Sequence, residues 1–185
     1  MLKDILKQTE ERMNKAVDAC RRELTHIRSG KATTALLDTV RVDYYGTMTP
    51  LTQIGNLSVL DVHTLAIQPW DRSVIGAVEK AILASDLGLN PSNDGTVVRI
   101  PIPVLTEERR RELVKLVKKF VEEGKIAIRN IRRDAIEHLK KAEKDEHASE
   151  DERKIAEKKV QEMTDKHTKE IDQLFTEKEK EIMEV

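Results

Sequence analysis

A row of basic side chains between residues 106 and 133 is the part of the sequence best suited to bind a ligand. This segment carries 10 basic and 5 acidic residues, whereas the whole chain has 33 basic and 34 acidic ones. A solvated helix face usually mixes the signs, because opposite charges four positions apart stabilise it. Here one sign predominates at the helical period, interrupted by Glu122, and the row consists of Arg111, Lys115, Lys118, Lys125, Arg129 and Arg132. Positive charge concentrated on a rigid helix predicts a phosphate backbone as the ligand.

Arginine is the better phosphate ligand in this row. Its planar guanidinium donates two parallel hydrogen bonds to one phosphate, which a lysine ammonium cannot do. We therefore expect Arg129 and Arg132 to contribute more than the lysines. An A-form RNA helix keeps its base edges in a deep, narrow groove, so the contacts would be made to phosphate and ribose. The alternative interpretation is a solvated face that keeps a long helix soluble.

Three segments have the apolar spacing of amphipathic helices, at residues 2–27, 106–142 and 149–182. Each would bury one face. In the segment with the basic row, the apolar positions are Leu113, Val117, Phe120, Ala127, Ile131, Ala135 and Leu139, and we expect the row to lie opposite them. Ser149 and Glu152 predict a capping box at the start of the third helix. Because apolar faces are not stable in water, the three helices are expected to form one bundle.

Residues 31–105 follow a different pattern. Apolar and polar residues alternate near 40–44, 57–59, 65–67 and 98–100, as in β-strands, with turns at 45–46, 54–55 and 93–95. A short helix is expected after an Asp71 N-cap, closing near Gly88, and Trp70 just before it is expected to pack inside. The fold class predicted is therefore α+β.

The predicted domain organisation is a three-helix bundle, residues 1–30 and 106–185, with a small β/α/β domain, residues 31–105, inserted into it. The chain would cross between them at Ser29-Gly30 and at Pro101-Ile102-Pro103. A permissive glycine in one crossing and two prolines in the other predict a hinge of limited range, with Ser29, Gly30, Pro101 and Pro103 as its residues. Arg28 and Lys31 flank Gly30, where they could contact RNA, cap the helix end, or do both.

No other group of residues predicts a reaction. The single cysteine, Cys20, cannot form an internal disulfide and lies on an apolar helix face, as does His167, so both are expected in the core. The histidines lack metal-ligand spacing, and the sequence has no glycine-rich phosphate loop. We therefore expect no cofactor, no metal and no enzyme activity. The charged start and the lack of a long apolar run predict a cytoplasmic protein without a membrane partner.

The sequence resembles the ribosome recycling factor family along essentially its whole length. The residues that carry the resemblance are Arg28-Ser29-Gly30-Lys31-Ala32, Val42-Asp43-Tyr44-Tyr45-Gly46, Ser85-Asp86-Leu87-Gly88-Leu89-Asn90-Pro91, Pro103-Val104-Leu105-Thr106-Glu107-Glu108-Arg109-Arg110 and Ala127-Ile128-Arg129-Asn130-Ile131-Arg132-Arg133. Many relatives have a proline soon after the hinge motif, where this chain has Ala32-Thr33-Thr34. Without that restraint, the entry to the hinge would be looser.

The resemblance implies an L-shaped molecule with the outline of a transfer RNA. It also implies a translation factor that, with elongation factor G and GTP, splits the post-termination ribosome into subunits, with its bundle on large-subunit ribosomal RNA. RNA-contacting residues carried over by motif are Arg28, Arg110, Arg129, Arg132 and Arg133. With the neighbouring lysines, the candidate set is Arg28, Lys31, Arg110, Lys118, Lys125, Arg129, Arg132 and Arg133.

Two other classes of function remain open at this point. A coiled-coil adaptor or holdase would bind proteins along its helices, with exposed apolar faces and little dependence on salt. A membrane-surface protein would lay its helices on lipid, but three complementary apolar faces can bury one another without lipid.

Under the main prediction, we expect a monomer whose partners are the ribosome and elongation factor G.

Overall fold

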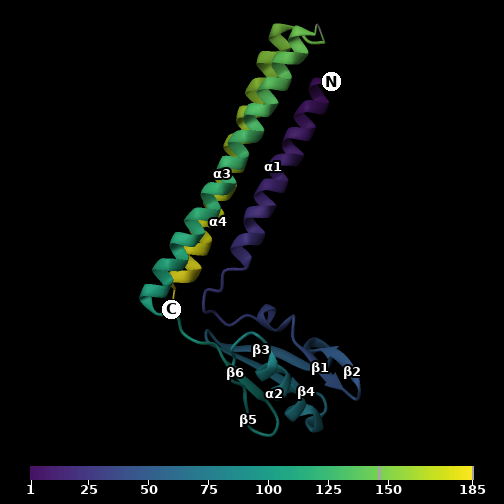
Figure 1. Cartoon of the computed structure of the whole chain (residues 1–185), viewed down its shortest axis with the longest axis vertical. Helices are drawn as coiled ribbons and strands as arrows, with labels where there is room; N and C mark the ends of the chain where they lie inside the picture. Colours follow the sequence, from purple (N-terminus) through teal and green to yellow (C-terminus); the bar gives the residue numbers. More distant parts are fainter. Residues whose placement is uncertain (146, 185) are drawn as a thin grey trace. The chain divides into compact units, whose positions relative to one another are not determined.

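The computed structural model describes residues 1–145 and 147–184. They form two compact units, each described by itself below. The bundle unit comprises residues 1–28 and 107–184, and the inserted unit comprises residues 29–106. The predicted α+β class is confirmed, because one unit consists of long helices and the other of a small sheet with a helix (Figure 1).

Three long helices lie side by side in the bundle unit (Figure 1). They are α1 (Leu2–Thr25), α3 (Glu107–Lys144) and α4 (Glu150–Met183). Their shared core contains fully buried side chains from all three, among them Met13 of α1, Ile128 of α3 and Ile171 of α4. Burial of these apolar faces against one another is the main stabilising term for helices of this length.

The buried face of α3 is centred on other residues than those predicted. Phe120 and Ala127 are only half-buried, whereas Val121, Gly124 and Ile128 are buried. The reason lies at Gly124, where an added Cβ would lie 3.2 Å from Cδ1 of Ile171 and 3.3 Å from Cβ of Cys20. Because glycine has no apolar side chain, a hydropathy pattern does not mark Gly124 as buried, although side chains of α1 and α4 pack closely against it.

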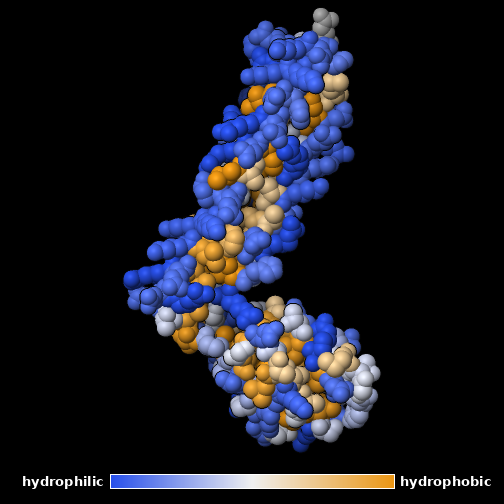
Figure 2. Space-filling model, viewed as in Figure 1, coloured by the Kyte–Doolittle hydropathy of each residue, from blue (hydrophilic) through white to orange (hydrophobic). Residues whose placement is uncertain are grey.

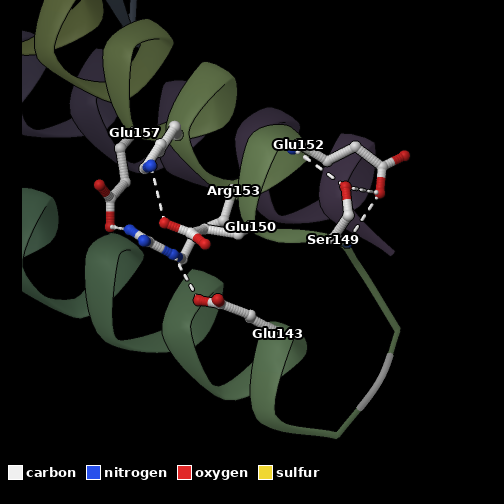
Figure 3. A network of polar contacts seen from close by, with 7 residues as sticks. Glu143, Ser149, Glu150, Glu152, Arg153 and Glu157 are labelled. Atoms are coloured by element: carbon white, nitrogen blue, oxygen red, sulfur yellow. Dashed lines mark hydrogen bonds and ion pairs between the residues drawn. The ribbon is translucent and has the colours of Figure 1, made fainter.

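Polar contacts stabilise the start of α4 and join it to the end of α3 (Figure 3). The predicted capping box is confirmed: Ser149 Oγ accepts a hydrogen bond from the Glu152 amide, and the Glu152 carboxylate accepts one from the Ser149 amide. Arg153 of α4 reaches across to α3, with its Nε 2.5 Å from Oε2 of Glu143, and also pairs with Glu157. These contacts fix how the two helices meet at this end.

The inserted unit contains two antiparallel sheets and one α-helix. A two-stranded sheet pairs β1 (Arg41–Tyr44) with β2 (Thr47–Pro50). The second sheet has the order β3-β4-β6-β5, from β3 (Gly55–Asp61), β4 (Thr64–Pro69), β5 (Ser92–Asn93) and β6 (Val98–Pro101). Helix α2 (Ile75–Ala84) packs its buried side chains against strands of both sheets, β1 of the first and β5 and β6 of the second. Three short 3₁₀ turns, η1 (Thr34–Leu37), η2 (Leu51–Gln53) and η3 (Arg72–Val74), connect these elements.

Several local predictions for the inserted unit are confirmed wholly or in part, and the one for Trp70 is wrong. Asp71 caps the turn that leads into α2, accepting a hydrogen bond from the Ser73 amide, although α2 ends at Ala84, before Gly88. The expected turn at 54–55 is confirmed at Ile54, whose amide donates to the Leu51 carbonyl, but it ends there because Gly55 begins β3 and pairs with Pro69 of β4. Trp70 does not pack inside; its side chain is 68% exposed, because η3 turns the chain so that Val74 and Ile75 fill the core instead.

Candidate nucleic-acid interface

One face of α3 points away from both neighbouring helices and is strongly basic. We call the exposed positions on this side between residues 115 and 144 the outer face of α3. It consists of Lys115, Leu116, Lys118, Lys119, Glu122, Glu123, Ile126, Arg129, Asn130, Arg133, Glu137, Lys140, Lys141 and Lys144, all of them exposed. Eight of these side chains are basic and three are acidic. At 1.5 Å per residue the face is about 44 Å long. Figure 2 shows the visible surface of the bundle unit as mostly hydrophilic, with hydrophobic atoms in separate patches.

Ion pairs with the other helices remove acidic charge from the two sides of this face. Asp134 accepts a hydrogen bond of 2.7 Å from Arg12 of α1, and Glu143 pairs with Arg153 of α4. Both carboxylates are therefore compensated at the helix contacts and do not offset the outer face. After residue 133 the sequence of α3 is nearly neutral in charge. Its exposed outer face is nevertheless net positive there, because two of the carboxylates are paired with other helices.

Three predicted site residues lie on the outer face: Lys118, Arg129 and Arg133. Arg129 Nη2 is 3.0 Å from Oε1 of Glu122, and both side chains are 55% exposed. An ion pair this exposed contributes little and can open for a competing phosphate. Arg133 forms no ion pair with any described residue. These three cations are placed to meet a polyanion without rearrangement of the fold.

The prediction that Lys125 and Arg132 lie opposite the apolar face is wrong. Both are half-buried and reach α4, where Lys125 pairs with Asp172 and Arg132 Nε donates a hydrogen bond of 2.8 Å to Oε1 of Gln161. Measured around the helix from Gly124, Lys125 lies at about 100° and Arg132 at about 80°, at the edge of the buried face. The same shift of the buried face that displaced Phe120 accounts for this error.

The remaining predicted residues lie apart from the outer face. Arg110, in the first turn of α3, is half-buried, and its Nε atom is buried without a hydrogen-bond partner among the described residues. Arg28 is exposed just beyond α1, in the bundle unit. Lys31 is half-buried and belongs to the inserted unit. The helical period does not bring these three side chains into the row on α3.

Gly30 and two residues beside the predicted hinge positions, Ala32 and Ile102, are bonded to the turn between β3 and β4. The Ala32 amide donates to the Val62 carbonyl at 2.7 Å, and the Ile102 amide donates to the His63 carbonyl at 2.7 Å. Nδ1 of His63 lies 3.2 Å from the Gly30 carbonyl oxygen, and Pro101 is the last residue of β6. Gly30 has φ +78°, a conformation that favours glycine. Both chain crossings are therefore anchored on one turn of the inserted unit.

Sequence reasoning missed four cations of the outer face: Lys119, Lys140, Lys141 and Lys144. The signal that could have found the last three is the helical period continued past Arg133, in combination with the interhelical pairing of Asp134 and Glu143. Charge counts along the sequence cannot show that pairing, because they add a compensated carboxylate to the same total as a free one.

The described residues offer binding chemistry and no cluster suited to a metal. Among residues 1–145 and 147–184, no three His, Cys, Asp or Glu side chains are placed to hold an ion. Cys20 is buried as predicted, and burial raises the pKa of its thiol, which disfavours the reactive thiolate. None of the described helices combines the length and the apolar character needed to span a bilayer.

Known proteins resemble this chain over its full length. The sequence profile described as "Ribosome recycling factor" matches residues 20–183. The ribosome-recycling factor of Symbiobacterium thermophilum is 60% identical over 185 residues, and that of Geobacillus thermodenitrificans is 56% identical over 185 residues; each alignment covers 100% of both chains.

Solved structures agree with these sequence relatives. The solution structure of a ribosome recycling factor is 45% identical with a TM-score of 0.76, and the match covers 100% of this chain and 98% of that one. A second structure contains the T. thermophilus ribosome recycling factor and the E. coli elongation factor G bound to the E. coli post-termination complex; its matching chain is 47% identical with a TM-score of 0.64 and full coverage of both chains. The profile match and the identity of full-length relatives lead to one conclusion: the chain belongs to the ribosome recycling factor family.

Proposed function

We propose that this protein docks on large-subunit ribosomal RNA through the outer face of α3 and, with elongation factor G and GTP, splits the post-termination ribosome into subunits. The family establishes a role in ribosome recycling. The observation that carries the RNA-binding part is the excess of basic over acidic side chains, eight to three, on one exposed face of a rigid helix.

The chemistry of the outer face fits a duplex RNA backbone. Arg129 and Arg133 present guanidinium groups that can each bond one phosphate at two points, and the lysines around them add point charges. Phosphate contacts of this kind fix the position and orientation of the protein and do not read the base sequence. Such binding weakens steeply with salt, because it releases counterions from the RNA.

The proposed role of the inserted unit is that of an arm on which elongation factor G acts. Support for that partner comes from the related structure in which a ribosome recycling factor and elongation factor G occupy one post-termination complex. In this proposal the GTPase supplies the hydrolysis, and this chain acts as a monomeric cytoplasmic factor that catalyses no reaction. The two crossings, anchored at Val62 and His63, would carry force from the arm to the bundle.

The adaptor or holdase alternative receives no support from the burial pattern. It requires exposed apolar faces along the helices, whereas Met13, Val117, Ile128, Val160 and Ile171 are completely buried in the bundle unit. A surface that binds proteins by hydrophobic contact would need these groups at the solvent boundary.

The test of the proposal is a ribosome-splitting assay followed by light scattering. Post-termination ribosomes are mixed with this protein, elongation factor G and GTP, and each component is omitted in turn. We expect dissociation into subunits only in the complete mixture, and no dissociation when GTP is replaced by a non-hydrolysable analogue. Splitting by this protein alone, or equal splitting with the analogue, would contradict the proposed division of labour.

A further inference from the structure

Two uncharged residues, Ile126 and Asn130, lie side by side in the middle of the outer face of α3. They are one helical turn apart, and both are exposed; 45% of Ile126 is accessible to solvent. Basic side chains lie two turns away on either side, Lys119 before Ile126 and Arg133 after it, each about 10 Å distant along the axis. Apart from Leu116 near one end, all the other residues of the outer face are charged.

Both residues go against local preference at these positions. Isoleucine is β-branched and apolar, so an exposed helix position gives it neither good rotamer freedom nor burial. Asparagine is a poor helix former that favours caps and turns, yet Asn130 lies in the interior of a 38-residue helix. Its amide makes no hydrogen bond with any other described side chain or backbone group. Local rules are typically broken in this way where a residue serves a ligand.

We infer that Ile126 and Asn130 contact the ribose edge of an A-form RNA duplex, in its minor groove, while the cations on either side hold the two phosphate backbones. This inference rests on the proposed docking of the outer face on RNA. The minor groove of A-form RNA is wide and shallow and displays ribose 2′-hydroxyls, which both donate and accept hydrogen bonds. The Asn130 amide can do the same, and the Ile126 side chain covers the apolar ribose carbons.

Charge around the pair favours RNA over a protein partner. The acidic neighbour Glu122 is engaged by Arg129, which leaves Glu123 and, two turns past Asn130, Glu137 as the carboxylates of the outer face near the pair without a partner in the described chain. A small apolar and amide contact between rows of cations complements a groove between rows of phosphates. A protein surface that matched it would need two acidic ridges with a neutral centre.

The test measures affinity for isolated large ribosomal subunits over a salt series. Ile126→Ser and Asn130→Ala are compared with Arg133→Ala and with the control variants Ile155→Ser and Gln173→Ala, exposed residues of α4. We expect Ile126→Ser and Asn130→Ala each to weaken binding about fivefold at every salt concentration, with an unchanged slope of log K against log salt. Arg133→Ala should make that slope shallower, and the α4 variants should match the wild type.

A second arm tests for the ribose itself. A short RNA duplex and a DNA duplex of the same sequence are titrated at low salt, where the basic face binds both. We expect the wild type to prefer RNA and Asn130→Ala to lose most of that preference. Equal affinity of the wild type for both duplexes, or subunit binding that Asn130→Ala and Ile126→Ser leave unchanged, would overturn the inference.

The outcomes separate this inference from the proposal on which it rests. If Arg133→Ala changes the salt slope while the two neutral positions have no effect, the outer face docks on RNA without ribose contacts from this pair. If the affinity for large subunits changes neither with salt concentration nor on Arg133→Ala, the docking proposal itself fails. Weaker subunit binding of Ile126→Ser, without any preference for RNA over DNA, would indicate a ribosomal protein as the neighbour and would overturn the ribose contact.

Discussion

Nε2 of the buried His167 on α4 lies 2.8 Å from the side-chain amide oxygen position of Asn14 on α1. The other ring nitrogen, Nδ1, lies 2.6 Å from the Met163 carbonyl oxygen. A neutral imidazole carries one N–H, so Nδ1–H donates to the carbonyl and Nε2 is left as an acceptor. The Asn14 side-chain amide then presents its NH₂ group to Nε2. The pair joins α1 to α4 inside the bundle unit.

Removing the Asn14 side chain should therefore destabilise the bundle unit more than its exposed position suggests. Asn14→Ala leaves the buried Nε2 atom without a partner, which costs about 1–3 kcal/mol. The measurement is the free energy of unfolding in urea, with wild type and variant compared at one pH.

A second pair of variants isolates the contact. In a His167→Leu background the orphaned acceptor no longer exists, so Asn14→Ala should then cost under about 0.5 kcal/mol. An equal cost of Asn14→Ala in both backgrounds would show that Asn14 acts through something other than His167.

Two glycines in the inserted unit should respond to alanine in opposite directions. An added Cβ at Gly55 would lie 2.5 Å from the Gln68 carbonyl oxygen and 2.8 Å from Cα of Pro69, both backbone atoms that cannot move without disturbing β4. Gly55→Ala should lower the stability of this unit by about 1–3 kcal/mol or more. Thermal unfolding, followed by the fluorescence of Trp70 in the same unit, measures the change.

Gly76, near the start of α2, is the matched control. Its added Cβ would meet no atom within 4 Å, and alanine is the better helix former, so Gly76→Ala should raise stability by up to about 1 kcal/mol. Similar loss of stability in both variants would mean that the glycines matter for a reason other than the space around their Cβ positions.

Cys20 should make the stability of the bundle unit depend on pH above neutrality. Burial raises the pKa of its thiol in the folded state, so folding favours the protonated form. Its contribution is complete below the unfolded pKa, about 8.5, and is lost as the pH rises through the raised folded pKa. Unfolding free energies should therefore fall more steeply between pH 8 and 10 for the wild type than for Cys20→Ala. Parallel curves for the two proteins would rule out this origin.

The three long helices can be predicted from the sequence, because each has an apolar pattern that repeats over many turns and depends only on residues close together in the chain. The capping box at Ser149 and the recurring apolar residues were enough to predict three helices, and His167 and Cys20 were correctly expected in the core. The short strands β2 and β5 were missed, because Thr47–Pro50 lacks apolar alternation and Ser92–Asn93 is too short to show a period. Their pairing depends on neighbours distant in sequence.

Positions around the helix were predicted less well than the helix itself. Gly124 has no apolar side chain, so the predicted buried face did not include it. The observed buried face includes Gly124, and Lys125 and Arg132 therefore lie at its edge and contact α4. Ion pairs between helices, such as Arg12 with Asp134, then decided which charges remain uncompensated at the surface. Both effects depend on contacts between helices. The spacing of apolar residues within one helix carries no information about those contacts.

The proposed transmission of force predicts that softer crossings impair splitting and spare binding. Two glycines inserted after Ser29 and two more after Pro103 would lengthen both connections without touching the bonds at Val62 and His63. Affinity for large subunits should stay within about twofold of the wild type, because the outer face of α3 is unchanged, while splitting by elongation factor G and GTP should slow at least about tenfold. Wild-type splitting rates would argue against force transmission through these crossings.

The docking of the outer face on ribosomal RNA is tested most directly by the salt dependence of binding to isolated large subunits. The triple variant Arg133→Ala, Lys140→Ala, Lys144→Ala is compared with Lys158→Ala, Lys159→Ala, Lys166→Ala, which removes three exposed cations of α4. We predict that the slope of log K against log salt falls in magnitude by about 2–3 for the α3 variant and remains that of the wild type for the α4 variant. Equal slopes for the two variants would contradict the assignment of this face as the RNA-binding surface.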